Sequence, residues 1–205
     1  MSESRNLALV HSRGEFVAIL DADDTWYPDT LARQVALLER HPRAGMACGT
    51  TLWWRSWAGG SGDSCDVVAA RAPVRDAPIG APDFASLIVG DGAAVPCVCA
   101  VIARAACLRA VGGLENSFRS LYEDQVLIAK IGLEWPVVVT SECLGRYRQH
   151  QGQSCVRAAN EGTVAQSRER FLEWLDGYAG ARGIDDPFFW QTLRQARTGA
   201  VSSVD

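Results

Sequence analysis

A short apolar run that ends in a cluster of acids constrains this chain more than any other feature. Phe16 to Leu20 are five consecutive apolar residues, and Asp21, Asp23 and Asp24 follow them directly. An unbroken apolar run of this length is typical of a strand buried on both faces, as in a parallel sheet. The run therefore predicts an α/β fold in which the acids lie at the C-terminal end of a strand.

The three carboxylates repel one another unless a cation joins them. Mg²⁺ and Mn²⁺ prefer oxygen ligands and commonly keep substrate phosphates as further ligands. The carboxyl edge of an open α/β sheet is also where ligands bind. The alternative interpretation is an exposed acidic turn in front of the next helix.

A helix is expected after these acids. Pro28 suits a first helical turn, and Leu31, Val35 and Leu38 recur at helical spacing, which predicts that they form the buried face. His41 precedes a proline and should end the helix, because that position avoids helical geometry.

This segment resembles the family 2 glycosyltransferases, which transfer sugars from nucleotide-sugar donors. The matching positions are Arg13-Gly14-Glu15-Phe16, Leu20-Asp21-Ala22-Asp23-Asp24, Trp26, Pro28-Asp29, Leu31 and Gln34-Val35-Ala36-Leu37-Leu38-Glu39. The resemblance implies a GT-A-like fold with a mixed, mostly parallel sheet flanked by helices. It also implies a bound Mn²⁺ or Mg²⁺ held by Asp23, with Asp21 or Asp24 assisting.

Family members carry further strands ahead of the acidic strand, and those strands hold the nucleotide base and ribose. By resemblance they are missing here, so we expect a partial GT-A domain over 1–158 and a C-terminal helical extension over 159–205. The apolar strand 16–20 would then form an exposed sheet edge, which invites pairing with another chain. An incomplete gene prediction is the favoured explanation; an oligomer through that edge and a decayed fragment are the alternatives.

A second acidic pair, Glu123-Asp124, precedes an apolar helical pattern. Taken alone, two acids at a helix start are most simply partners of the helix dipole. The family has an acidic pair at this place, and its aspartate is the catalytic base. The resemblance therefore implies that Asp124 is the base and that Glu123 lies near the acceptor.

Four further positions are implicated by resemblance. Arg5, in a predicted helix over 4–12, and Arg148 are expected beside the donor diphosphate, together with Asp21. His150 is expected to reach the metal or the diphosphate, although a lone histidine in a polar loop is more often solvated. The segment 141–157 is a candidate mobile loop that excludes water during the reaction.

Two adjacent tryptophans, Trp53 and Trp54, follow a predicted strand. Indole rings beside a cleft stack on sugar rings, so both are candidate acceptor-binding residues. The alternative is a tryptophan-rich edge of the core.

Composition narrows the class of protein. The net charge of −4 gives no reason to expect nucleic acid as a partner, and no segment approaches the roughly 18 apolar residues of a membrane span. The seven cysteines have irregular spacing and are expected to be mostly buried, reduced thiols. We therefore expect a cytoplasmic protein, with a peripheral position at the inner membrane face as an alternative.

These observations predict a metal-dependent, inverting glycosyl transfer from a nucleotide-diphospho-sugar to a saccharide, lipid or other hydroxyl acceptor. One alternative is an inactive fragment or partner subunit that binds no donor. Another is a different phosphate-handling α/β enzyme with an acidic metal site, such as a nucleotidyltransferase.

Overall fold

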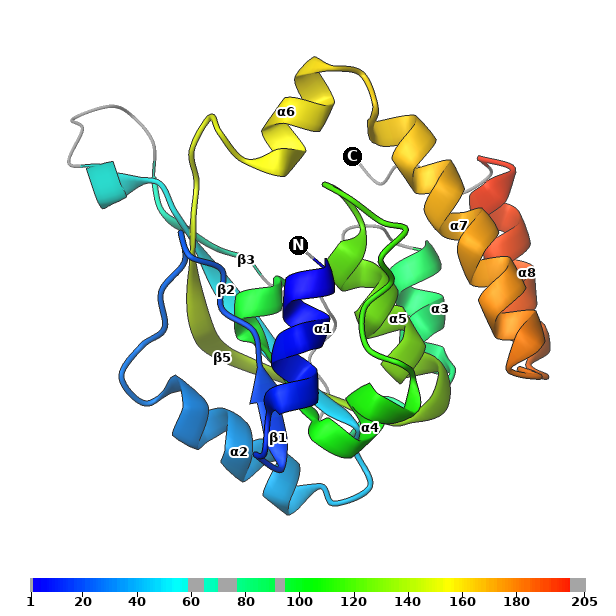
Figure 1. Ribbon diagram of the computed structural model, residues 1–205, viewed down its shortest axis with the longest axis horizontal. Helices are drawn as coiled ribbons and strands as arrows, with labels where there is room; N and C mark the ends of the chain where they lie inside the picture. Colours follow the sequence, from blue (N-terminus) through cyan, green and yellow to red (C-terminus); the bar gives the residue numbers. More distant parts are fainter. Residues whose placement is uncertain (1, 59–64, 70–76, 91–94, 200–205) are drawn as a thin grey trace.

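The computed structural model describes residues 2–58, 65–69, 77–90 and 95–199 of the chain (Figure 1). Its helices are α1 (Ser2–His11), α2 (Thr30–Arg40), α3 (Asp83–Gly90), α4 (Ala105–Ala110), α5 (Glu123–Glu134), α6 (Ser154–Asn160), α7 (Val164–Ala181) and α8 (Pro187–Arg197), with short 3-10 turns η1 (Ser56–Ala58) and η2 (Val98–Ala100). Its strands are β1 (Phe16–Ala18), β2 (Met46–Trp54), β3 (Val67–Ala69), β4 (Val101–Arg104) and β5 (Val137–Arg148).

The strands form one mixed sheet built around β2. On one edge β2 pairs antiparallel with β4 and, further along, with β3, and on the other edge it pairs parallel with β5. β1 pairs antiparallel with β4 and ends the strand order. The α/β class and the mixed sheet flanked by helices are thus confirmed.

Among the described strands, β1, β2 and β5 run in one direction, and β3 and β4 run opposite to them. Of the four strand pairings, only β2–β5 is parallel, because β4 lies reversed between β1 and β2 and β3 is also reversed beside β2. The apolar character of the segment 95–103 indicated burial but carried no information about strand direction. The sequence therefore indicated which residues form the sheet but not which of its strands are reversed.

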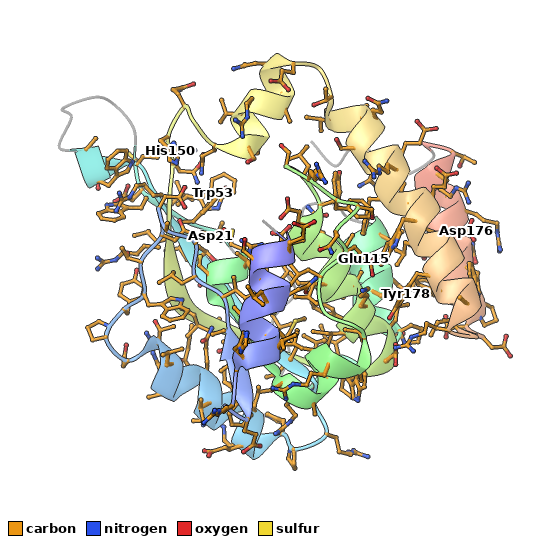
Figure 2. The ribbon with its side chains drawn as sticks, viewed as in Figure 1. Asp21, Trp53, Glu115, His150, Asp176 and Tyr178 are labelled. Atoms are coloured by element: carbon orange, nitrogen blue, oxygen red, sulfur yellow. The ribbon has the colours of Figure 1, made fainter. Side chains whose placement is uncertain are left out.

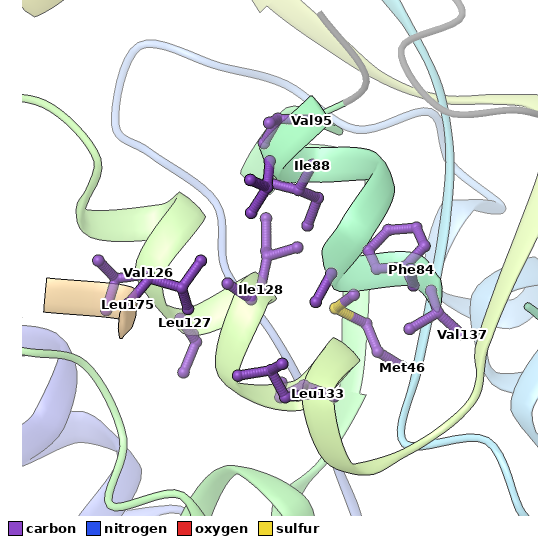
Figure 3. Close-up of a cluster of buried hydrophobic side chains, with 14 of the residues drawn as sticks. Met46, Phe84, Ile88, Val95, Val126, Leu127, Ile128, Leu133, Val137 and Leu175 are labelled. Atoms are coloured by element: carbon purple, nitrogen blue, oxygen red, sulfur yellow. The ribbon is translucent and has the colours of Figure 1, made fainter. Parts of the chain in front are cut away.

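Two clusters of buried side chains cover the two faces of the sheet. The larger cluster joins Met46 and Val137 of the sheet to α3, α5, α7 and α8, and Figure 3 shows part of it around Phe84 and Ile128. The smaller cluster joins α2, through Leu37 and Leu38, to the opposite face. In Figure 1, α2 accordingly lies on one side of the sheet, with α3 and α5 on the other.

The strand β1 contributes to both clusters, as an apolar strand should. Phe16 and Ala18 pack against the smaller cluster, and Val17 and Ile19 pack against the larger one. Both faces of β1 are therefore covered, although the strand lies at the end of the sheet. The predicted oligomer through its free edge stays a prediction.

The buried face of α2 differs from the expected one. The helix ends at Arg40 as predicted, but its buried residues are Thr30, Gln34, Leu37 and Leu38. Leu31 is 45% exposed, so its assignment to the core face is wrong. The hydroxyl of Thr30 donates to the carbonyl of Leu144 at 2.9 Å, which lets a polar residue take the buried position.

The segment 141–157 is not the expected mobile loop. β5 continues to Arg148, and α6 begins at Ser154, so most of the segment has regular structure. Its pairing with β2 is irregular: Val139 lies opposite Cys48, but Gly145 already lies opposite Thr51. This bulged register brings Arg146 opposite Leu52 and Arg148 opposite Trp54.

The last two helices pack into the larger cluster. Leu175 of α7 and Phe189 and Leu193 of α8 belong to it, together with residues of α3 and α5. Asp186 caps α8 by accepting a hydrogen bond from the amide of Phe189 at 2.7 Å, and Pro187 takes the first helical position, as the sequence predicts. The helices over 159–199 thus share a core with the sheet, and the expected boundary at 158 stays a prediction.

In the part of the chain that the structure describes, no helix combines the length and apolar character needed to cross a bilayer. All seven cysteines are free thiols, but only Cys48, Cys99 and Cys107 are buried, fewer than expected. The cytoplasmic location stays a prediction.

Candidate active site

The acidic turn lies directly after β1, and its three carboxylates have three different environments. The amide of Asp24 donates to the carbonyl of Asp21 at 3.1 Å, which closes the turn. Figure 2 shows Asp21, Trp53 and His150 at the same end of the molecule. The turn therefore stands where β2 and β5 also end.

Asp24 is the buried member of the cluster, with 6% of its surface exposed. It accepts a hydrogen bond from the backbone amide of Arg148 at 3.0 Å. Burial raises the pKa of Asp24 to about 6, and the charges of Asp23 and Asp21 add to this rise. Asp24 therefore ties the turn to β5 and is less available to a ligand than its neighbours.

Asp23 faces solvent and contacts His150. Its Oδ2 lies 3.0 Å from Nε2 of His150, while Nδ1 of the same ring accepts a hydrogen bond from the amide of Gly152 at 3.2 Å. An accepting Nδ1 leaves the ring hydrogen on Nε2, which donates to the carboxylate. This hydrogen bond lowers the pKa of Asp23, which favours the ionised carboxylate. The side chain of Asp23 is also partly exposed to solvent.

Asp21 forms an ion pair with Arg5 of α1. The position of Arg5 is fixed by its neighbour Asn6, whose side-chain amide donates to the carbonyl of Leu114 at 2.9 Å and accepts from the amide of Leu114 at 2.8 Å. Gly113 is needed at this contact, because a Cβ on it would lie 2.5 Å from the Asn6 oxygen. Helix α1 and the segment around Gly113, far apart in the sequence, are thus joined in space.

Asp124 lies in the first turn of α5, partly buried beside a small apolar cavity lined by Val17, Ile19 and Leu127. Burial raises the pKa of its carboxyl, and the positive charge of Arg5 opposes that rise. Asp21 acts electrostatically on Asp124 as well. The structure therefore brings the two acidic centres of the sequence together, with Arg5 acting on both.

The backbone ahead of Asp124 is strained. Ser120 and Tyr122 have positive φ angles of 86° and 67° without being glycine. The Tyr122 ring stacks on Phe171 with centroids 5.0 Å apart, which helps to hold this conformation. Such strain is typical of segments that position a functional group.

Glu123 is 7% exposed and its carboxylate is already hydrogen bonded. It accepts from the amide of Ser120 at 2.9 Å and from the hydroxyl of Ser2 at 3.4 Å. It also lines a second, larger cavity together with residues of α1 and α6. Glu123 is therefore placed beside a cavity, apart from the two tryptophans proposed with it.

Arginines and aromatic rings alternate beside the acidic turn. The Arg146 guanidinium lies 4.5 Å from the Tyr27 ring and 5.7 Å from the Trp54 ring, and that of Arg148 lies 5.3 Å from Trp54 and 4.8 Å from Trp57. Within the described residues neither guanidinium has a carboxylate within ion-pair distance, although Arg148 lowers the pKa of Asp23 through its charge. We call this the arginine–aromatic stack; it holds two cations in fixed positions.

Trp53 and Trp54 are separated by the sheet. Consecutive strand residues point to opposite faces, so only Trp54 joins the arginine–aromatic stack. Trp53 has the Arg55 guanidinium at 5.9 Å from its ring instead. The structure therefore does not bring the two rings into one binding surface.

The side chains of the acidic turn supply only part of the ligand set of a divalent cation, and substrate phosphates and water would have to supply the rest. No three His, Cys, Asp or Glu side chains converge on a metal position within the residues described here. Asp21 is paired with Arg5 and Asp24 is buried, which leaves the ionised Asp23 with His150 beside it. One carboxylate and one imidazole suit Mn²⁺ or Mg²⁺ when phosphates and water complete the ligand shell.

Sequence reasoning missed two residues of this site. Arg146 was available to it, because Arg146, Arg148 and His150 follow the two-residue period of a strand. Cys99 gave no signal: its thiol hydrogen bonds to the Asp24 carboxylate from a segment 75 positions away. A contact between segments this far apart in the sequence becomes visible only in the three-dimensional structure.

One comparison with known proteins gives a family match for the start of the chain. Residues 1–53 match the model of glycosyl transferase family 2. No curated protein matches the chain.

Solved structures of S. aureus TarS share the fold. The TarS 1–349 complex with UDP-GlcNAc is 18% identical with a TM-score of 0.61 and is matched over 85% of this chain and 45% of that one. TarS 1–349 without ligand is 19% identical with a TM-score of 0.55 and is matched over 85% of this chain and 43% of that one. A longer TarS structure is 18% identical with a TM-score of 0.55 and is matched over 85% of this chain and 26% of that one. This chain thus spans less than half the length of these structures. Residues 1–53 thus resemble glycosyl transferase family 2, and the fold of the chain resembles that of the TarS structures.

Proposed function

We propose that the chain takes part in metal-dependent transfer of a sugar from a nucleotide-diphospho-sugar to an acceptor hydroxyl, with inversion at the anomeric carbon. The observation that carries the proposal is the position of Asp124 beside Val17 and Ile19, which lead into the acidic turn, with Arg5 paired to Asp21 of that turn. UDP-GlcNAc is the first donor to test, because the similar TarS structure contains it.

In this mechanism Asp124 accepts the proton of the attacking hydroxyl. Its partly buried position keeps bulk water from competing for the carboxylate, and the charge of Arg5 favours the ionised form against the effect of burial, which raises the pKa of Asp124. No residue near Asp124 stands out as a nucleophile for a retaining route, so direct displacement is the simpler scheme.

The other residues bind and neutralise the donor. Asp23 and His150 would hold Mn²⁺ or Mg²⁺, which supplies positive charge to the leaving diphosphate. Arg146 and Arg148 of the arginine–aromatic stack add fixed cations whose planar N–H groups suit phosphate oxygens. Asp24 orients the turn by its hydrogen bond to the Arg148 amide.

Replacing Asp23 by alanine tests the donor half of the proposal. Wild-type protein is expected to bind UDP-GlcNAc in calorimetry when Mn²⁺ is present and to lose most of this binding when Mn²⁺ is chelated. Asp23→Ala should lose the Mn²⁺-dependent part, because it removes the exposed carboxylate.

Asp29→Ala is the matched control, since Asp29 is an exposed acid in the same segment whose ion pair among the described residues is with Arg33. It should bind like the wild type. Equal metal-dependent binding by Asp23→Ala and wild type would refute the metal assignment. Absence of donor binding in the wild type would support the inactive alternative, and preference for nucleoside triphosphates would support a nucleotidyltransferase.

The pH dependence of transfer tests the base. The active form of Asp124 is the carboxylate, and burial raises its pKa above the ordinary value of 3.8. Activity should therefore fall with decreasing pH at a higher pH than an ordinary aspartate would give. Arg5→Gln removes the charge that opposes this rise and should move the acid limb of kcat/KM further upward. An acid limb that is unchanged in Arg5→Gln would contradict this role for Arg5.

A further inference from the structure

The larger of the two cavities described above is lined by Glu123, the neighbour of Asp124 in α5, and has no part in the donor scheme. Its volume is about 450 Å³, within the range of small-molecule sites. It is bounded by the start of α1, the segment 116–123 and α6, and Figure 1 shows α6 across from the N-terminal end of α1. Three separate parts of the chain thus build one cavity.

The acidic and basic side chains that line this cavity differ in whether the protein itself supplies their partners. Glu123 is held by Ser120 and Ser2, so its carboxylate is satisfied within the protein. Arg119 and Arg157, which come from different elements, form no ion pair within the described residues, and the hydrogen bond found for Arg157 is one to the Ser154 hydroxyl at 3.4 Å. Glu3 is the remaining acid, so two guanidiniums face one uncommitted carboxylate.

The cavity also has the position and the polar groups that an acceptor needs. Glu123 directly precedes Asp124, so the cavity adjoins the first turn of α5, which also carries the proposed base. The lining includes Ser120, Asn116 and Ser154, whose side chains are able to exchange hydrogen bonds with hydroxyls.

We infer that this cavity binds the acceptor, and that the acceptor carries an anionic group, a phosphate ester or a carboxylate, which Arg119 and Arg157 bind. The inference rests on the proposed function in naming the ligand an acceptor. A planar guanidinium binds phosphate or carboxylate oxygens through two parallel hydrogen bonds, and two of them from different elements fix one anion from two sides. A neutral sugar would leave both cations unused.

The test is a titration without donor or metal, followed by NMR chemical shifts, with three probes of one sugar scaffold. Glucose carries no charge, glucose 6-phosphate adds a phosphate ester, and glucuronate adds a carboxylate. Wild-type protein is expected to bind at least one charged probe about tenfold more tightly than glucose, with the largest shifts at residues 116–123 and 154–157. The charged probe that binds identifies which anion the cavity takes.

Arginine variants locate the binding. The double variant Arg119→Gln/Arg157→Gln should weaken charged-probe binding about tenfold or more and leave glucose binding unchanged. Arg194→Gln, which removes an exposed arginine of α8, should behave like the wild type. Equal binding of all three probes, no binding of any probe, or unchanged charged-probe binding in the double variant would overturn the inference.

This experiment separates the inference from the proposed function. Asp23→Ala should lose metal-dependent donor binding and keep probe binding, because the two sites share no lining residue. Failure of the donor experiment with intact probe binding would refute glycosyl transfer and leave an anion-binding cavity.

Discussion

Asp124→Asn is expected to lower kcat for sugar transfer by about 10²–10⁴-fold, the usual contribution of a general base. The amide oxygen can still accept the hydrogen bond that the Gln125 amide donates to Asp124 at 2.8 Å, so the local structure should persist. The amide cannot accept the proton of the acceptor hydroxyl. The measurement is steady-state transfer together with calorimetric donor binding, which should be unchanged.

The control separates catalysis from helix stabilisation. Asp83 is an exposed acid in the first turn of α3, so Asp83→Asn removes a similar partner of a helix dipole far from the site. It should leave turnover intact. If Asp124→Asn retains wild-type turnover, Asp124 is a dipole partner, which is the simpler interpretation that its sequence position allowed.

Lys130→Met is expected to lower the free energy of unfolding by about 3–5 kcal/mol, as for other buried ion pairs that lose one partner. Lys130 is the chain's only lysine and is 1% exposed. Its ammonium pairs with Glu115 and donates to the carbonyls of Val111 and Gly113 at 3.1 and 3.0 Å. Methionine fills a similar volume but leaves these oxygens without their donor. Urea unfolding measures the loss.

Arg182→Met is the matched control. Both cations lie over the Tyr178 ring, at 5.4 Å for Lys130 and 5.5 Å for Arg182, and both pair with a glutamate. Arg182 is at the surface, where such pairs contribute about 0–1 kcal/mol. A loss for Lys130→Met no larger than that for Arg182→Met would show that burial adds nothing. The expected value lies toward the lower end of the range because Glu115 is 32% exposed.

The sequence predicted the elements that depend on local pattern. The apolar run of β1, the end of α2 before Pro42, the acids that open α5 and the proline that starts α8 are all visible in the residues themselves. The same pattern placed Asp23, Asp124 and His150 near element ends, where the structure has them. Local chemistry fixes these features, so one sequence is enough to find them.

Features that depend on distant contacts were not predictable. The direction of β4 and the separation of Trp53 from Trp54 follow from strand pairing, which periodicity does not specify. Leu31 fits a helical apolar stripe but faces solvent, because Thr30 finds a carbonyl partner in β5. The thiol of Cys99 and the cavity around Glu123 also arise from segments far apart in the chain.

The irregular pairing of β5 has a consequence for how this chain can change length. Between Val139 and Gly145, β5 advances six residues while β2 advances three, from Cys48 to Thr51. β5 thus has three more residues than β2 in this stretch. Because three is an odd number, the side chains of β5 that follow the bulge face the opposite way from the pattern before it. Arg146 and Arg148 therefore point to the same side of the sheet as Val137 and Val139. Losing one residue there would turn both cations to the reverse side and bring Tyr147 into their place. Loss of a pair would preserve the facing, so even-numbered indels are the ones this strand can absorb.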